Sequence, residues 1–428
     1  MTTLKATAVI LLAALITGCN RTRVHVSFAG RNAPDAEVYV NDNLRGQTDA
    51  NGILSISPQL PAGTELIARQ RIFERAAYRQ DHDGWVQRVY ITSMRVNDDG
   101  TLSTLRITDP AATQELVLEN NNVLNGLHVV VSLDWDASEA ELEDMRQKWI
   151  EAARYIWNLT DGQVLFEQVE IADNARFWPS AEYHYWADNT IWPHTVWLGG
   201  YLGREWFGQP TIEMSRRTDS NASHPRMFVH EFGHLGFSIQ DEYAGLNIGG
   251  NFCTANMLTT GNLFSPGMPQ ASCFMDNHMA AQKICSGHPD NPHRNMNFQI
   301  WSPCWNSVLS NYGDTQNPPR WLLKSPDTRG AIVGQLPPLP PQWEPRINVF
   351  NGGSPVCAPI PVTVFFQDLT TPAPGYAVLL LPATGGAISM GKSDANGNIT
   401  VVGAHIGDSI KTPTQVLPVT SANCTPVP

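Results

Sequence analysis

The 428-residue sequence predicts a multidomain protein in which a central α/β domain lies between two β-sandwich domains. Three observations lead to this prediction. The length exceeds that of a usual single domain, a strand–helix–strand pattern occupies the middle of the chain, and short strand-like runs occur at both ends. Hydrophobic residues make up 42% of the chain and charged residues 16%, a balance that favours globular domains over a disordered chain.

The first residues have the pattern of an export signal. Lys5 precedes nine consecutive apolar residues, Ala8 to Ile16. Nine residues suit a signal peptide, whereas a membrane-spanning helix needs about 20. The end of this run, "LITGC" (residues 15–19), resembles the lipobox of bacterial lipoproteins, which are cut before a cysteine that then carries a lipid. The resemblance implies a signal peptide over residues 1–18 and a lipid on Cys19 that tethers the protein to the bacterial cell envelope, at the outer membrane or cell surface. The alternative is an ordinary cleaved signal with an incidental cysteine.

Two classes of partner are excluded by the sequence. The net charge of −12 and the lack of Lys/Arg runs argue against nucleic acid. The run "GAISMGKS" (residues 386–393) formally matches a phosphate-binding loop, but a polar turn and a strand-like run follow it, where nucleotide binding needs a helix. We therefore expect no nucleotide.

The β domains are predicted from a sequence similarity within the chain. The segments "GQTDANGILSI" (residues 46–56) and "GKSDANGNITV" (residues 391–401) each place a polar Asp-Ala-Asn-Gly turn before an alternating run. Asn-Gly readily supplies the positive φ of a tight turn. With the strand-like runs around them, both segments resemble the small Ig-like or carboxypeptidase-regulatory-like β-sandwiches attached to exported bacterial enzymes. We expect one such domain at each end.

The middle of the chain opens with a strand, "LHVVVSLDW", a long helix and a second strand, "QVLFEQVEI". The helix, predicted over residues 138–159, has an apolar face formed by Leu142, Met145, Trp149, Ala152, Ala153 and Ile156. The proline-rich run "GQLPPLPPQWEPR" suits a stiff linker. The predicted boundaries are 1–18 for the signal peptide, 19–122 for the N-terminal β-sandwich, 123–333 for the central domain, 334–346 for the linker and 347–428 for the C-terminal β domain.

The candidate site is the run "HEFGHLGFSIQDEY", residues 230–243. Pro225 suits the first turn of a helix on which His230 and His234 lie about 40° and one turn apart, so both imidazoles can reach one ion. Glu231 is then placed to take a proton from a metal-bound water, whose pKa zinc lowers to about 7. The alternative is a core helix with two incidental histidines.

A third ligand is needed, because two histidines do not hold a catalytic zinc unaided. On a continued helix Asp241 would lie roughly 10 Å beyond His234, so the helix must end near Gly236. The run resembles zinc metallopeptidases of the IgA-protease and immune-inhibitor-A types, with the motif H-E-F-G-H, a short turn and D-E-Y, which are related to the metzincins. The resemblance implies a metzincin-like central domain, with His230, His234 and Asp241 as zinc ligands and Glu231 as the general base.

The sequence departs from the metzincin pattern, whose third ligand would fall on Gln240, and Glu242 therefore stays as an alternative to Asp241. The resemblance also implies a methionine turn beneath the metal, for which "CFMDN" with Met275 is the best match, and the alternative is ordinary core. The resemblance further implies that Tyr243 donates a hydrogen bond to the oxyanion that develops during the reaction. The alternative is that Tyr243 has a packing role.

Six cysteines remain besides Cys19, and an even number in an exported chain indicates disulfides. Cys357–Cys424 is the first pairing that we predict. Cys253, Cys273, Cys285 and Cys304 allow three connectivities. The alternative for this segment is a second zinc site formed by Cys285, His288, His293 and Cys304, although disulfides are favoured in an exported chain.

Together these observations predict a lipid-anchored zinc endopeptidase that hydrolyses proteins or glycoproteins. One alternative is a surface adhesin or glycan-binding lipoprotein that retains zinc without turnover, but such a protein has no need of Glu231. A zinc amidase or deacetylase acting on envelope material is the other. The aromatic-rich residues 177–208 line a binding cleft in one interpretation and form core in the other.

Overall fold

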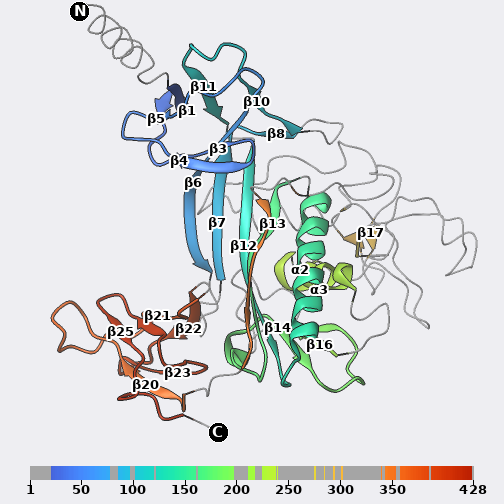
Figure 1. Ribbon diagram of the computed structural model, residues 1–428. Helices are drawn as coiled ribbons and strands as arrows, with labels where there is room; N and C mark the ends of the chain where they lie inside the picture. Colours follow the sequence, from blue (N-terminus) through green and yellow to red (C-terminus); the bar gives the residue numbers. More distant parts are fainter. Residues whose placement is uncertain are drawn as a thin grey trace, which may run out of the picture. The chain divides into compact units, whose positions relative to one another are not determined.

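The structure is a computed structural model of the chain (Figure 1). The residues that it describes are 21–77, 85–96, 102–119, 122–160, 162–196, 211–216, 224–237, 239, 274–275, 284, 293–294, 300–301, 339, 343–352, 357–384 and 387–426. Neither α-helix of these residues has the length and apolar character needed to span a membrane. The chain divides into two compact units, one formed by Met1–Ile72, Tyr90–Leu124 and Pro340–Gln342, and the other by Phe73–Val89, Asn125–Leu339 and Trp343–Pro428.

The first unit is built from strands. In one sheet β1 pairs in parallel with β11 and in antiparallel fashion with β2 and β5. Alternate residues of β11 are buried, as in a strand with one face on a core. A second set pairs β3 with both β4 and β6. The strands are β1 (Thr22–Phe28), β2 (Arg31–Asn32), β3 (Glu37–Val40), β4 (Asn43–Gln47), β5 (Ile53–Ile56), β6 (Glu65–Ala77, up to Ile72 in this unit), β8 (Arg95–Val96), β9 (Leu102–Ser103), β10 (Leu105–Arg106) and β11 (Gln114–Leu118).

The two Asp-Ala-Asn-Gly segments form the same turn. The Asp49 and Asp394 carboxylates each accept hydrogen bonds from the backbone N–H groups two and four residues further on, at 2.8 to 3.0 Å. Gly52 and Gly397 have φ of +70° and +76°. A Cβ at either glycine would lie within 2.9 Å of a backbone carbonyl oxygen. The similarity between the two segments therefore reflects one turn that only glycine completes without strain.

The second unit contains a largely parallel sheet in the order β15-β16-β14-β12-β13-β19. β12 and β13 are buried at every position, which is typical of parallel strands covered on both faces. β15 is antiparallel to β16 and ends this order of strands. The strands are β7 (Trp85–Thr92, up to Val89 in this unit), β12 (Val123–Leu133, from Asn125 in this unit), β13 (Val164–Ala172), β14 (Tyr183–Trp186), β15 (His194–Val196), β16 (Thr211–Ser215), β17 (His293–Arg294), β18 (Ile300–Trp301) and β19 (Arg346–Phe350).

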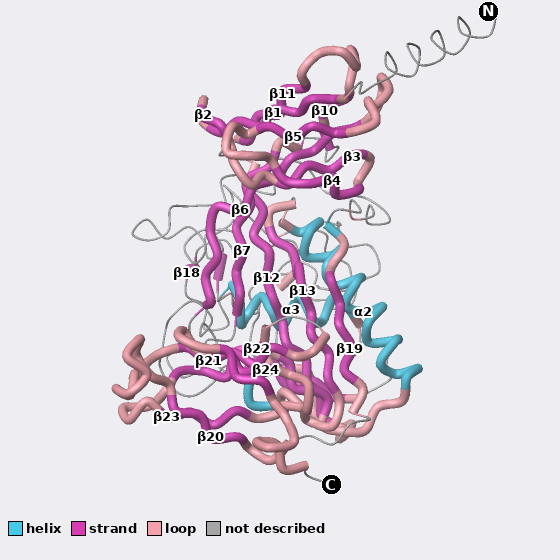
Figure 2. Tube along the Cα trace, turned by 60° about the vertical axis from the view of Figure 1, so that its left-hand side comes forward, coloured by secondary structure: helices cyan, strands magenta, loops and turns pink. Residues whose placement is uncertain are grey.

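Two helices pack on one face of this sheet (Figure 2). Helix α2 (Glu139–Leu159) begins with a capping box between Ser138 and Glu141, and all six residues predicted for its apolar face are buried, so this prediction is confirmed. Helix α3 (Pro225–Phe237) begins at the predicted proline. Trp149 of α2 contacts Phe166 of the sheet and Phe228 of α3, with ring centroids 5.3 and 5.2 Å away. The aromatic contacts thus fix α3 against α2 and the sheet.

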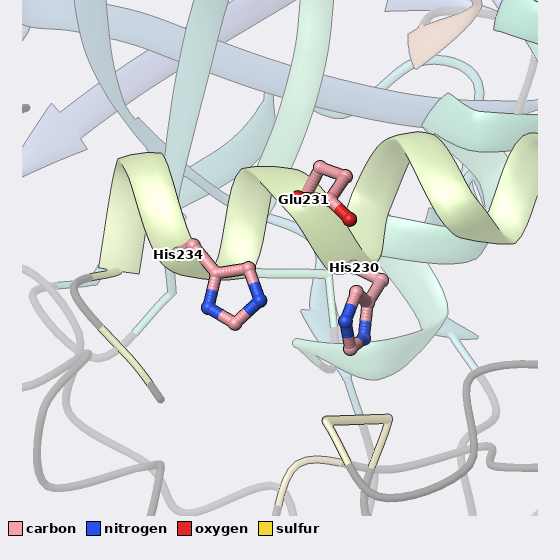
Figure 3. Close-up of side chains that lie close together, drawn as sticks. All are labelled: His230, Glu231 and His234. Carbon is pink, nitrogen blue, oxygen red and sulfur yellow. The ribbon is translucent and has the colours of Figure 1, made fainter. Parts of the chain in front are cut away.

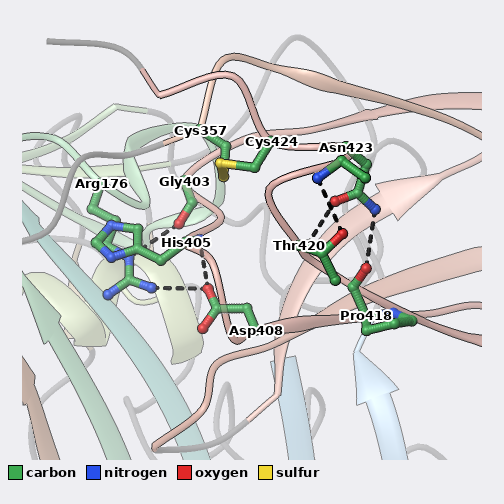
Figure 4. The surroundings of a disulfide bond; sticks show 10 residues. Arg176, Cys357, Gly403, His405, Asp408, Pro418, Thr420, Asn423 and Cys424 are labelled. Atoms are coloured by element: carbon green, nitrogen blue, oxygen red, sulfur yellow. Dashed lines mark hydrogen bonds and ion pairs between the residues drawn. A yellow bond between two sulfur atoms is a disulfide. The ribbon is translucent and has the colours of Figure 1, made fainter.

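The C-terminal strands share a hydrophobic core with this sheet. Val130, Phe177 and Phe350 pack in the same cluster as the buried residues of the C-terminal strands. The predicted disulfide Cys357–Cys424 is confirmed (Figure 4), and both cysteines belong to this core. A short 3-10 helix, η1 (Trp178–Ser180), contacts β22. The strands are β20 (Ile360–Thr363), β21 (Ala377–Leu381), β22 (Ile388–Lys392), β23 (Asn398–Val401), β24 (Ser409–Lys411) and β25 (Val416–Pro418).

A buried arginine also connects the C-terminal strands to the sheet. Arg176, which follows β13, donates from Nε to the carbonyl oxygen of Gly403 at 3.0 Å and from its Nη2 to Oδ2 of Asp408 at 3.1 Å (Figure 4). The Arg176 and Asp408 side chains are 7% and 4% exposed. A Cβ at Gly403 would lie 2.0 Å from the carbonyl oxygen of Arg176, so the two backbones approach as closely as glycine permits.

The predicted fold class, a central α/β metzincin-like domain flanked by two β-sandwich domains, is wrong. Among the described residues strands are far more common than helices; they are arranged in several sheets, and two α-helices accompany them. Hydrophobic periodicity identifies a strand but not its partner. Residues 346–350 illustrate this, because a segment assigned to the linker and the C-terminal domain instead pairs with β13 as β19.

Candidate metal centre

Helix α3 brings together three of the predicted site residues. One ligand atom each from His230, Glu231 and His234 lies within 4.8 Å of the others, and all three side chains are buried. Figure 3 shows the two imidazole rings projecting from the same side of the helix, and their centroids are 5.0 Å apart. This agrees with the spacing of one helical turn. The set can hold a metal ion.

The hydrogen bonds of the two rings define their protonation. His230 Nδ1 lies 3.1 Å from the carbonyl oxygen of Phe274, and His234 Nδ1 lies 2.7 Å from that of Ile239. A carbonyl oxygen only accepts, so each Nδ1 carries a proton, and in the neutral ring the lone pair is then on Nε2. Metal-ligating histidines have this arrangement, in which one nitrogen donates to the protein and the other binds the ion. The residues therefore fit a metal that prefers imidazole ligands.

The segment Phe274–Met275 packs directly against α3. Both side chains are fully buried. A Cβ at Gly233 would lie 2.6 Å from Met275 Sδ and 2.8 Å from Cζ of the Phe274 ring. Gly233 lies between the two histidines, so its missing side chain lets this segment approach the helix closely enough for the Phe274 carbonyl to reach His230. The structure thus places Met275 beside the turn that carries both histidines.

Gly233→Ala is expected to weaken metal binding by about 10- to 100-fold, the usual cost of disturbing a partner of a ligating histidine. The added Cβ would push the Phe274 ring away and lengthen the bond to His230 Nδ1. Competition with a chromophoric chelator measures the affinity. Adding Phe274→Ala, which removes the ring but keeps the carbonyl, should recover part of the loss. An unchanged affinity in the single variant would show that this contact does not support the site.

Two strands hold α3 in place through hydroxyl groups. Tyr183 of β14 donates to the carbonyl oxygen of Phe228 at 2.7 Å. Burial raises the pKa of Tyr183 well above its ordinary value, so the hydroxyl stays protonated and keeps donating. Thr195 of β15 lies 3.0 Å from the carbonyl oxygen of Glu231 and 3.1 Å from its Oε2. The sheet therefore fixes both the helix and the carboxylate that it carries.

Several predicted site residues lie outside the described residues. They are the two candidates for the third ligand, Asp241 and Glu242, together with Tyr243, and their roles stay predictions. Helix α3 ends at Phe237, one residue after the predicted end, and Ile239 follows with its carbonyl on His234. Cys19 and the four cysteines between residues 253 and 304 also lie outside, as does the proposed second zinc set apart from the backbone of His293.

The aromatic-rich segment is mostly core over its described part, residues 177–196. Phe177, Tyr183 and Tyr185 are fully buried. Trp178 stacks on the His184 ring with centroids 4.1 Å apart, and Trp192 is 56% exposed. The described aromatic rings of this segment therefore pack mainly against one another and the sheet.

Sequence reasoning missed three groups at this site: the Phe274 and Ile239 carbonyls, and the Thr195 hydroxyl. Every residue has a carbonyl, so no sequence signal distinguishes these two. Thr195 lies in a short run between tryptophans and carries no motif. Only the pairing of β15 with β16 brings it beside α3.

No protein-family model, curated protein or solved structure matches this chain.

Proposed function

We propose that this protein is a zinc-dependent endopeptidase of the bacterial cell envelope, tethered by a lipid on Cys19, that hydrolyses proteins or glycoproteins. The observation that carries the proposal is the buried set of His230, Glu231 and His234, whose two histidines donate from Nδ1 to backbone carbonyls. The motif resemblance to IgA-protease and immune-inhibitor-A metallopeptidases supports the choice of zinc and of a peptide substrate.

His230 and His234 would hold the ion through Nε2, with Asp241 or Glu242 as the third ligand. Bound zinc supplies a Lewis acid that polarises the scissile carbonyl and lowers the pKa of its water. Beside such an ion, Glu231 would be the base that takes a proton from the attacking water at a carboxylate oxygen and passes it to the leaving amine. This role needs a carboxylate beside the metal that is held by the protein, and the Thr195 hydroxyl holds this one.

The test is to purify the full chain in detergent, measure its metal content, and remove the metal with a chelator before adding zinc back. We expect about one zinc per chain. Cleavage of a panel of glycoproteins, followed by mass spectrometry of the new termini, should disappear with the metal and return with zinc.

Three other outcomes would contradict the proposal. Cleavage by the metal-free chain would exclude a zinc mechanism, and failure to bind zinc would exclude His230 and His234 as its ligands. Stoichiometric zinc without cleavage of any panel protein would favour the adhesin, which retains zinc without turnover.

A further inference from the structure

One hydroxyl group contacts the carboxylate of Glu231 from outside its helix. Thr195 Oγ1 lies 3.1 Å from Glu231 Oε2 and 3.0 Å from the backbone carbonyl oxygen of the same residue. Thr195 is half-buried on β15, and Glu231 is 4% exposed. Among the described residues, Thr195 is the side chain that donates a hydrogen bond to this carboxylate.

The position of Thr195 is fixed by strand pairing. β15 is antiparallel to β16, with Thr195 opposite Ile212, and β15 packs against α3. Threonine branches at Cβ, so its χ1 angle is restricted. The hydroxyl is therefore a rigid point on the sheet, whereas a glutamate on a helix has three side-chain bonds about which it can rotate.

We propose that Thr195 is a positioning residue that holds the Glu231 carboxylate in the orientation needed for proton transfer. This inference rests on the proposed function, because it concerns the group that takes the proton. A base contributes fully only when it is held within hydrogen-bond reach of the proton that it removes, and rotation away from that geometry lowers the rate rather than the affinity for substrate.

A hydroxyl suits both stages of the proton transfer. While Glu231 is ionised, the hydroxyl of Thr195 donates to Oε2. Once a proton has reached Oε2, the carboxylic acid can donate to Oγ1, and the Thr195 proton turns to the backbone carbonyl oxygen 3.0 Å away. The contact can thus persist while Glu231 holds the proton and after it gives the proton up.

The test compares Thr195→Val, which keeps the branched shape and replaces the hydroxyl by a methyl group, with Thr195→Ser, which keeps the hydroxyl. For the valine variant we expect kcat to fall about 10- to 100-fold, as for a lost hydrogen bond to a charged group, with KM changed by less than about twofold. Serine should restore kcat to within about threefold of the parent. Zinc content and the affinity for zinc should match the parent in both variants.

Thr211→Val is the matched control. Thr211 lies on the neighbouring strand β16, and its hydroxyl donates to the Glu213 carboxylate at 2.6 Å rather than to Glu231. This variant loses a hydrogen bond of the same kind, from a threonine to a carboxylate, but leaves the bond to Glu231 in place. Its kcat should therefore stay within about threefold of the parent. Thr195→Ala replaces the valine variant if thermal unfolding shows that valine disturbs the fold.

The outcomes separate this inference from the proposed function. If the parent enzyme cleaves no substrate, the proposed function fails. If the parent cleaves and Thr195→Val has the same kcat, or loses rate only through KM or through zinc, Thr195 does not position Glu231. Failure of serine to restore kcat would also overturn the inference, because it would assign the effect to the shape of the side chain.

Discussion

Glu231→Gln is expected to lower kcat/KM for protein substrates by about 10²- to 10⁴-fold, the contribution of a general base, while leaving the metal in place. Glutamine has nearly the same shape as glutamate, and its amide oxygen can still accept the hydrogen bond from Thr195. It cannot take up the proton of the attacking water. Metal analysis of the purified variant and steady-state kinetics on one identified cleavage site measure the two quantities.

His234→Ala is the contrasting variant. It removes one of the two nitrogens that would bind the ion, so zinc content and activity should fall together. If Glu231→Gln also loses its zinc, Glu231 is a ligand rather than the base. If Glu231→Gln keeps both its zinc and its rate, another group takes the proton and the mechanism proposed for this site is wrong.

The parts of the structure that the sequence predicts well are those determined by neighbouring residues. The buried face of α2 follows from apolar residues repeating every three or four positions, and the start of α3 follows from Pro225. The Asp-Ala-Asn-Gly turns follow from a carboxylate that bonds to nearby backbone and a glycine with positive φ. The spacing of His230 and His234 is of the same kind, since one helical turn separates them.

The parts that could not be predicted depend on partners far along the chain. The pairing of β19 with β13 joins residues about 180 positions apart, and no local pattern encodes it. The same applies at the metal centre. Phe274 reaches His230 from 44 residues away and Thr195 reaches Glu231 from 36. The motif therefore specified the three residues of the candidate metal centre, but not the carbonyls and the hydroxyl that contact them.

Arg176→Met is expected to destabilise the second unit by about 3–5 kcal/mol, the cost of breaking a buried ion pair by removing one partner. Burial lowers the pKa of Arg176, and Asp408 opposes this effect by stabilising the charged guanidinium. Methionine would fill much of the space of the arginine stem. It would leave Asp408, which is 4% exposed, without its charged partner, and it would remove the donor to the Gly403 carbonyl. Urea unfolding of the full chain, followed by tryptophan fluorescence, measures the shift of the midpoint.

Arg216→Met is the matched control, because Arg216 and Glu141 form an ion pair at 2.6 Å with side chains 44% and 35% exposed. Water solvates both charges there, so the loss should stay within about 1 kcal/mol. Equal shifts in the two variants would show that burial does not strengthen the Arg176–Asp408 contact.

A double variant, Arg176→Met with Asp408→Asn, separates the pair from its surroundings. Asp408 now accepts the N–H of Ala383 at Oδ1 (2.9 Å) and the N–H of His405 at Oδ2 (2.8 Å), and the single side-chain oxygen of asparagine would keep one of these two bonds. With neither charge left in the core, the double variant should be less destabilised than the sum of the two single variants. Additive losses would instead mean that each residue acts through its own backbone contacts. In that case the close packing at Gly403 and the shared core of Val130, Phe177 and Phe350 would be what joins the C-terminal strands to the sheet that carries the site.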